Sequence, residues 1–298
     1  MTTEQGVVNS LSTDHFDLTV DLERGAKITS LVDRTGREWL AQAEPGRARA
    51  PGAPFTDAEM AGWDECAPTV DACVVNDEAM PDHGDLWDHP FAGTAAHASI
   101  VREGLGFAFE RSIREVPGGI RMSYRATALR DRIPFLWAAH PQFCAPPGTR
   151  VKIDAVRVVD VIDPDEPLIA IDDALATIDT VDAGGYRKWY ADPQEPVTSA
   201  SLVRADGSQL DLAWSDNCPY VGVWFDNGAF SREPIIAIEP SNGYRDALAL
   251  AMERDRVLFI EPGAPLEWWV DVRVLPALNF TDEGSRNADS CAPMPEQA

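Results

Sequence analysis

The chain has 298 residues, of which 45% are hydrophobic and 8% aromatic, which is enough to bury the core of one large domain or two ordinary ones. Its 25 basic and 49 acidic residues give a formal net charge of −24, which excludes the basic surface typical of nucleic-acid-binding proteins. No apolar run approaches the ~20 residues that a membrane-spanning helix requires, and residues 1–12 lack the basic start and apolar stretch of a secretory signal. We therefore expect a cytoplasmic protein with no nucleic-acid or membrane partner, for which a homodimer is left open.

The five cysteines predict free thiols. Their number is odd, no CxxC pair occurs, and no histidine stands at zinc-like spacing from them (Cys66, Cys73, Cys144, Cys218, Cys291). A pair between Cys66 and Cys73 is an alternative, but two small apolar residues near strand ends are the more ordinary case. The sequence thus predicts no structural metal site.

In chain order, short alternating runs come first. Phe16, Leu18, Val20 and Leu22 alternate with polar residues, and turn-forming residues follow at 24–25 and 33–36, which predicts successive strands. The stretch 41–61 is rich in proline, glycine and alanine and predicts a long loop. Residues 106–114 and 120–129 then flank Pro117-Gly118-Gly119, which indicates a β-hairpin.

Seven further strands are expected in the second half of the chain, at residues 151–161, 199–203, 210–214, 220–225, 235–239, 257–260 and 266–275. Helical periodicity is rare and predicts one short helix or turn at 246–252. The fold class is therefore all-β, a large antiparallel β-sandwich with fewer than about a fifth of its residues helical. We expect residues 1–277 to form one domain and 278–298 to be a loose tail.

Three segments place titratable residues beside turn-forming or aromatic neighbours, as sugar-handling sites often do: 80–87, 135–143 and 236–243. Glu239 ends an apolar strand and precedes Pro240, and partial burial there would raise its pKa and make it a better base. An ion pair at a strand end fits the same pattern. By spacing alone His140 is typical of a core histidine and His83 of a loop histidine.

Taken together, these segments resemble the aldose 1-epimerase (galactose mutarotase-like) family in order and relative placement. The likeness runs from about residue 14 to 276, and each motif is short, so their shared order carries it. The matching pieces are Gly25–Leu31 and Gly36–Leu40 for the first hairpin, Ala61–Thr69, His83-Gly84, His140-Pro141-Gln142-Phe143, Ile238-Glu239-Pro240 and Glu261-Pro262-Gly263.

The resemblance implies a β-supersandwich that binds a small-molecule sugar across one concave sheet, with no metal and no organic cofactor. It implies that Glu239 takes the proton of the anomeric hydroxyl and that His140 protonates the ring oxygen. His83 would orient the sugar and share the acid role. The ring opens, and closure after rotation about one bond gives the other anomer.

Candidates for substrate contacts are Trp63, Asp64, Lys188, Trp224 and Asp226. The two tryptophans, like Trp137, suit sugar stacking, although core packing is the commoner role. Lys188 is expected to be a loop cation near aromatic residues that meets an anionic substituent, with a solvated lysine as the alternative. Asp192 and Asp216 compete with Asp226 as the further substrate-binding acid, and each also suits a turn.

The expected function is an aldose 1-epimerase-like mutarotase, an isomerase of aldoses or substituted aldoses. Asp85-Leu86-Trp87 follows His83 where some branches of the family carry an arginine, which argues against a hexose-6-phosphate substrate. Two alternatives stay open: a sugar-binding protein without turnover, since fold does not imply function, and a lyase or isomerase that uses the same glutamate and histidines.

Overall fold

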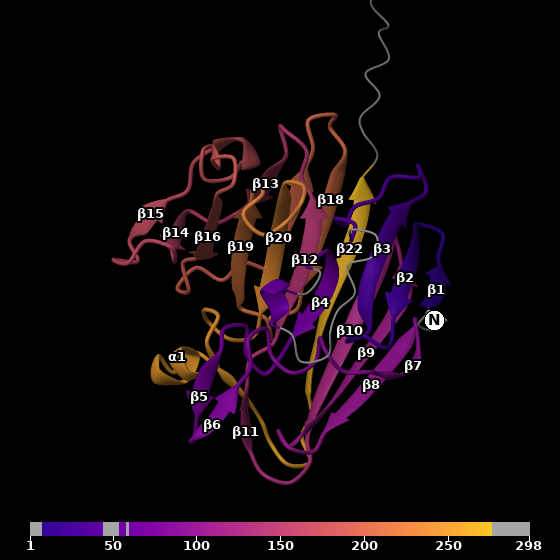
Figure 1. The fold of residues 1–298 in the computed structure, drawn as a ribbon, viewed down its shortest axis with the longest axis vertical. Helices are drawn as coiled ribbons and strands as arrows, with labels where there is room; N and C mark the ends of the chain where they lie inside the picture. Colours follow the sequence, from indigo (N-terminus) through magenta and orange to yellow (C-terminus); the bar gives the residue numbers. More distant parts are fainter. Residues whose placement is uncertain (1–7, 44–53, 58–59, 276–298) are drawn as a thin grey trace, which may run out of the picture.

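The computed structural model describes residues 8–43, 54–57 and 60–275, which form two large β-sheets with very little helix (Figure 1). The larger sheet has ten strands, in the order β1 (Val8–Ser12), β2 (Phe16–Asp21), β3 (Lys27–Asp33), β4 (Gly62–Cys66), β12 (Ala138–Cys144), β20 (Ile235–Ser241), β19 (Tyr220–Asp226), β16 (Tyr186–Ala191), β14 (Arg157–Asp160), β15 (Leu168–Ala170). The second has eight, in the order β13 (Arg150–Ile153), β17 (Ser199–Val203), β18 (Gln209–Trp214), β22 (Leu266–Leu275), β10 (Gly119–Ala128), β9 (Phe107–Val116), β8 (His97–Arg102), β7 (Ala92–Thr94).

The remaining elements are small. Two hairpin-like pairs stand apart from the large sheets, β5 (Cys73–Val75) with β6 (Glu78–Met80) and β11 (Ile133–Phe135) with β21 (Leu258–Ile260). Helical structure in the described residues is confined to α1 (Leu248–Glu253) and the single 3₁₀ turns η1 (Phe55–Asp57) and η2 (Ile178–Thr180). None of these helices is long and apolar enough to cross a membrane.

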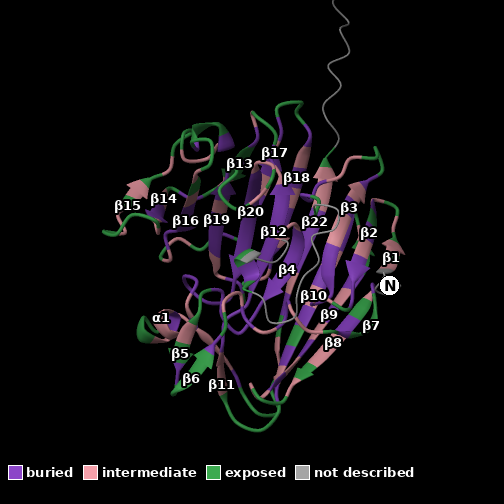
Figure 2. Ribbon diagram, viewed as in Figure 1, coloured by how far each residue is buried: buried purple, intermediate pink, exposed green. Residues whose placement is uncertain are grey.

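The two sheets pack face to face around one apolar core. Every pairing between the named strands is antiparallel, and buried residues alternate along strands such as β9 and β18 (Figure 2). Trp137 from the larger sheet meets Trp268 from the smaller one, with ring centroids 5.2 Å apart. The predicted all-β antiparallel sandwich is confirmed.

The hairpin predicted around Pro117-Gly118 is confirmed in detail. β9 and β10 pair from Val116 opposite Gly119, so the loop has two residues. Gly118 has a φ of +81°, a conformation that a two-residue hairpin turn needs and that glycine adopts without strain.

Three predictions for the elements were wrong. The strand expected at 151–161 is two strands in different sheets, β13 and β14, because the chain crosses between the layers after Ile153. β4 was missed because all five of its residues are buried, so no alternation marks it. The segment around Lys188, expected to be a loop, is strand β16. Most of the expected 41–61 loop and the 278–298 tail lie outside the described residues.

Four of the five cysteines are described, and all four are free thiols. Cys66 and Cys218 are buried, and Cys73 and Cys144 are half-buried. The expectation of free thiols is therefore confirmed for these four, while Cys291 lies outside the described residues.

A buried ion pair joins the sheets beneath the core. Arg111 of β9 donates to Glu65 of β4 over 2.9 Å, and both side chains are 1% exposed. The same carboxylate accepts hydrogen bonds from the Tyr124 hydroxyl (3.2 Å) and the Trp137 indole (2.9 Å). Burial raises the pKa of Glu65, although Arg111 opposes the shift.

We expect Arg111→Met to destabilise the protein by ~3–5 kcal/mol, because it leaves the Glu65 carboxylate buried without its cation. Chemical denaturation monitored by tryptophan fluorescence measures this. The control is Arg125→Met on the neighbouring strand β10, whose ion pair with Glu267 is largely exposed and contributes at most about 1 kcal/mol. Equal stability losses in the two variants would contradict this account.

Candidate active site

The site lies on the outer face of the larger sheet, where four adjacent strands, β12, β20, β19 and β16, present polar side chains on one side. Glu239 of β20 is opposite Gly222 of β19, which is opposite Tyr190 of β16. Partners in an antiparallel ladder share a face, and so do residues two apart along a strand. Lys188, opposite Trp224 in the same ladder, therefore lies on the face of Glu239.

A glycine makes this arrangement possible. A Cβ atom on Gly222 would lie 2.9 Å from the ring of Tyr190, so any larger residue would displace that ring. With glycine there, Tyr190 lies across β19 and its hydroxyl reaches the carboxylate of Asp246 over 2.8 Å.

A cavity of about 330 Å³ opens on this face, within the size range of small-molecule sites. His83, His140 and Glu239 all line it, although they come from three distant segments. The structure thus brings together the three residues that the sequence nominated for proton transfer. The other lining residues are Thr56, Met60, Val70, Asp71, Asp82, Val161, Ile162, Lys188, Trp224, Phe230, Arg245, Asp246, Ala247 and Leu250.

His140 and Glu239 face each other at the base of the cavity. His140 Nε2 lies 3.7 Å from Glu239 Oε1, and the two residues are 5% and 1% exposed. The Gln142 amide nitrogen lies 3.0 and 3.3 Å from the two ring nitrogens of His140. Burial, reinforced by the charges of His83, Lys188 and Lys27, holds the pKa of His140 well below its usual 6.5. His140 is therefore neutral at pH 7.

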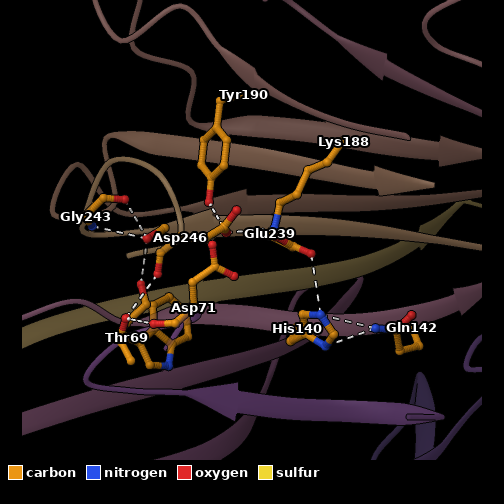
Figure 3. A network of polar contacts seen from close by, with 11 residues as sticks. Thr69, Asp71, His140, Gln142, Lys188, Tyr190, Glu239, Gly243 and Asp246 are labelled. Atoms are coloured by element: carbon orange, nitrogen blue, oxygen red, sulfur yellow. Dashed lines mark hydrogen bonds and ion pairs between the residues drawn. The ribbon is translucent and has the colours of Figure 1, made fainter. Parts of the chain in front are cut away.

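Lys188 is the centre of a charge network. Its ammonium group lies 2.8 Å from Glu239 Oε2 and 2.7 Å from Asp246 Oδ1 (Figure 3). Burial alone would lower the pKa of Lys188, but the charges of Asp246 and Glu239 outweigh it and raise that pKa. The lysine is thus a fixed cation. It is 7% exposed, which corrects both the expected loop position and the alternative of a solvated lysine.

Glu239 feels opposing influences. Burial raises its pKa and the charge of Asp246 adds to this, while Lys188 acts in the opposite direction. The net direction is upward, which makes the carboxylate a stronger base than an exposed glutamate. Its lysine partner supplies the counter-charge that lets it remain ionised in a buried position.

His83 lies above this floor in a loop. Its Nδ1 is 3.1 Å from the carboxylate of Asp82. Its ring stacks on Phe55 with centroids 3.7 Å apart and meets His140 edge-on at 5.1 Å. The residue has a φ of +57°, a conformation that is uncommon outside glycine. These contacts fix the imidazole beside His140.

Carboxylates outnumber cations among the lining residues. Asp71, Asp82 and Asp246 accompany Glu239, against Lys188 and Arg245. Arg245 is itself paired with Glu166 over 2.8 Å, and Lys188 contacts two carboxylates. The cavity therefore offers little positive charge to an anionic substituent.

The five candidates for substrate contacts separate into two groups. Lys188 and Trp224 line the cavity, whereas the other three lie outside its lining. Trp63 is fully buried in the core between the sheets, and Asp64 pairs with Lys27 over 3.0 Å with both side chains inaccessible. Asp226 is also fully buried and holds the loop that follows β19 through backbone N–H groups.

The competing aspartates are not at the cavity either, and other residues were missed. Asp192 pairs with Arg157 over 2.7 Å; neither it nor Asp216 lines the cavity. The sequence gave no reason to choose Asp71, Tyr190, Phe230 or Asp246, since an aspartate near a turn is ordinary. Asp246 follows the Glu239 motif by seven residues, and its main-chain carbonyl accepts the N–H groups of Val70 and Asp71.

Among the residues that the structure describes, no group of three histidine, cysteine, aspartate or glutamate side chains is arranged to hold a metal ion.

Comparisons with known proteins support the fold. No protein-family model matches the sequence, and no curated protein matches it. Solved structures do match over most of both chains. The Slr1438 protein of Synechocystis sp. PCC 6803 is 18% identical, with a TM-score of 0.75 and coverage of 92% of this chain and 97% of that one. A galactose mutarotase-like protein of Lactobacillus casei ATCC 334 is 18% identical, with a TM-score of 0.68 and coverage of 90% and 100%.

A candidate aldose 1-epimerase of Escherichia coli K12 is 14% identical, with a TM-score of 0.68, and the match covers 90% of this chain and 99% of that one. The three matches share the sandwich architecture over nearly the full length of each protein. The chain therefore has the galactose mutarotase-like fold.

Proposed function

We propose that the protein is a mutarotase that interconverts the α and β anomers of an aldose by acid–base ring opening and closure. The observation that carries the proposal is the short distance between an acid–base pair, His140 Nε2 and Glu239 Oε1 at 3.7 Å, on the floor of a sugar-sized cavity. The fold shared with galactose mutarotase-like structures supports the same class of reaction.

The spacing suits this chemistry. Mutarotation removes a proton from the anomeric hydroxyl and adds one to the ring oxygen, and both oxygens are bonded to the same carbon. An acid and a base that serve them must therefore stand close together. An inverting glycosidase, by contrast, separates its two carboxyl groups by about 6.5–9.5 Å to admit a water molecule.

Glu239 is the base in this scheme. Its raised pKa favours proton uptake, and Lys188 keeps it ionised in the free protein by direct contact. When Glu239 takes the anomeric proton it loses its charge, and Lys188 stays neutralised by Asp246. The network therefore tolerates both protonation states of the base.

The two histidines divide the acid role. His140 is neutral, so it donates a hydrogen bond to the ring oxygen as an electrophile, as neutral imidazoles do in some active sites. His83, beside the Asp82 carboxylate, brings the proton. The transfers balance: the anomeric proton moves to Glu239, the His83 proton moves to the ring oxygen, and closure on the other face reverses both.

We expect His83→Gln to lower the exchange rate by about 10²-fold or more, because the proton donor is gone. His140→Gln keeps a neutral N–H donor and should cost less than His140→Leu, which keeps none. Exchange rates from two-dimensional NMR on all three variants test the division. A larger loss in His140→Gln than in His83→Gln would give the proton-donating role to His140.

The test of the function itself is anomer-resolved exchange NMR on purified protein. The panel comprises neutral aldoses, amino sugars, uronic acids and hexose 6-phosphates. We expect exchange above the uncatalysed rate for uncharged aldoses and little for the anionic sugars, since carboxylates dominate the cavity lining. Binding of a sugar without any faster exchange would refute the mutarotase proposal in favour of a binding protein.

A further inference from the structure

We infer that the protein accepts reducing disaccharides, and that a second pyranose ring rests on three aromatic residues at the cavity mouth, Tyr186, Trp224 and Phe230, called here the aromatic platform. The inference rests on the proposed anomer exchange, because that reaction fixes which end of the sugar lies deepest. It names a second subsite next to the one that holds the reacting ring.

The platform is a compact cluster of rings. Tyr186 and Trp224 stack with centroids 4.9 Å apart and planes 24° apart, and Phe230 lies 5.3 Å from Tyr186 and 5.7 Å from Trp224. Tyr186 precedes Lys188 by two residues on β16, so both side chains lie on the same face of the sheet. Trp224 is directly opposite Lys188 on β19.

This alternation produces a graded path out of the cavity. Glu239 at its floor is 1% exposed and Lys188 is 7% exposed. Trp224 is half-buried, while Phe230 and Tyr186 at the mouth are 40% and 44% exposed. Trp224 and Phe230 also line the cavity, so the platform is continuous with the site of proton transfer.

The protein holds this platform in place. The fully buried carboxylate of Asp226 accepts backbone N–H groups from Ala229 (2.6 Å), Phe230 (3.1 Å) and Ser231 (2.7 Å). The loop that carries Phe230 is thereby fixed from below. The buried indole nitrogen of Trp224 has no hydrogen-bond partner among the described residues, so this N–H is available to a hydroxyl group of a ligand.

The chemistry of the reaction decides what can reach the platform. A mutarotase needs a free anomeric carbon beside Glu239, so only a group attached at another position of the sugar extends toward the mouth. Exposed aromatic faces with a spare N–H donor suit a pyranose ring, which has apolar C–H faces and a rim of hydroxyls. The carboxylate-rich lining disfavours a phosphate or carboxylate in that place.

The test compares the two sugar sizes. Exchange NMR gives kcat/KM for maltose, cellobiose and lactose and for glucose, their shared reducing-end sugar, in wild type and in Tyr186→Ala. We expect at least one disaccharide to be favoured over glucose, and Tyr186→Ala to lower that ratio about tenfold, the factor that ~1.4 kcal/mol of stacking supplies. Phe230→Ala should act in the same direction. Trp269→Ala, an aromatic on β22 of the other sheet, is the control and should leave the ratio unchanged.

Two results would overturn the inference: glucose favoured over every disaccharide in wild type, or a ratio that does not respond to Tyr186→Ala. Calorimetry with the same sugars separates this inference from the proposed function. If no anomer exchanges but a disaccharide binds more tightly than glucose and loses that advantage in Tyr186→Ala, the platform stands and the mutarotase proposal fails. Equal binding of all these sugars removes the platform as well.

Discussion

Glu239→Gln is expected to lower the rate of anomer exchange by about 10²–10⁴-fold, the usual contribution of a general base. Glutamine keeps the volume of the side chain and its contact with Lys188, but it cannot take up the anomeric proton. Sugar affinity should be largely retained, because the ground-state contacts come from other lining residues. Exchange NMR gives the rate, and calorimetry on the same sample gives the affinity.

Glu267→Gln is the matched control for this variant. Its carboxylate pairs with Arg125 on the other sheet and is largely exposed, so the substitution should change neither rate nor affinity. Exchange at the wild-type rate in Glu239→Gln would remove Glu239 as the base. Loss of sugar binding together with activity would instead assign Glu239 to substrate binding.

Lys188→Met is expected to shift the acidic limb of the pH profile of kcat/KM upward by at least about one unit, which at pH below that limb is a tenfold or greater loss. Methionine preserves most of the volume but removes the cation that opposes the raised pKa of Glu239. The base is active as a carboxylate, so activity should recover as the pH rises above the new limb. The measurement is kcat/KM from pH 4 to pH 9 for both proteins.

The same variant should lose stability, by ~3–5 kcal/mol at neutral pH, because Glu239 and Asp246 are left buried without their shared cation. The sign with pH follows from the raised pKa. A carboxyl group that holds its proton more tightly folded than unfolded stabilises the fold at low pH, and that stability is lost as the pH rises through the folded pKa. Denaturation at pH 5 and pH 8 therefore shows the larger deficit at pH 8.

Lys152→Met, at an exposed lysine of β13, is the control for both measurements and should resemble wild type. An unshifted acidic limb in Lys188→Met would show that Lys188 does not set the ionisation of Glu239. In that case its part would be limited to holding β16 to the turn before α1.

The sequence by itself determined the fold class and the residues most suited to acid–base work. Period-two alternation, the Pro117-Gly118 turn and the scarcity of helical patterns are local signals, so strands such as β17 and β22 could be placed to the residue. Glu239, His140 and His83 stood out because each lies in a short motif with unusual neighbours. Strands buried on both faces, such as β4, gave no such signal.

The tertiary structure alone decided what surrounds those residues. Whether Lys188 is solvated or buried depends on Asp246, 58 residues away, and no local pattern reports a contact over that distance. The register of β16, β19 and β20 sets Lys188, Trp224 and Glu239 on one face, and a shift of one residue would turn each of them away. Trp63 and Asp64 were misleading for the same reason, since burial between or within layers is a property of the packed sheets.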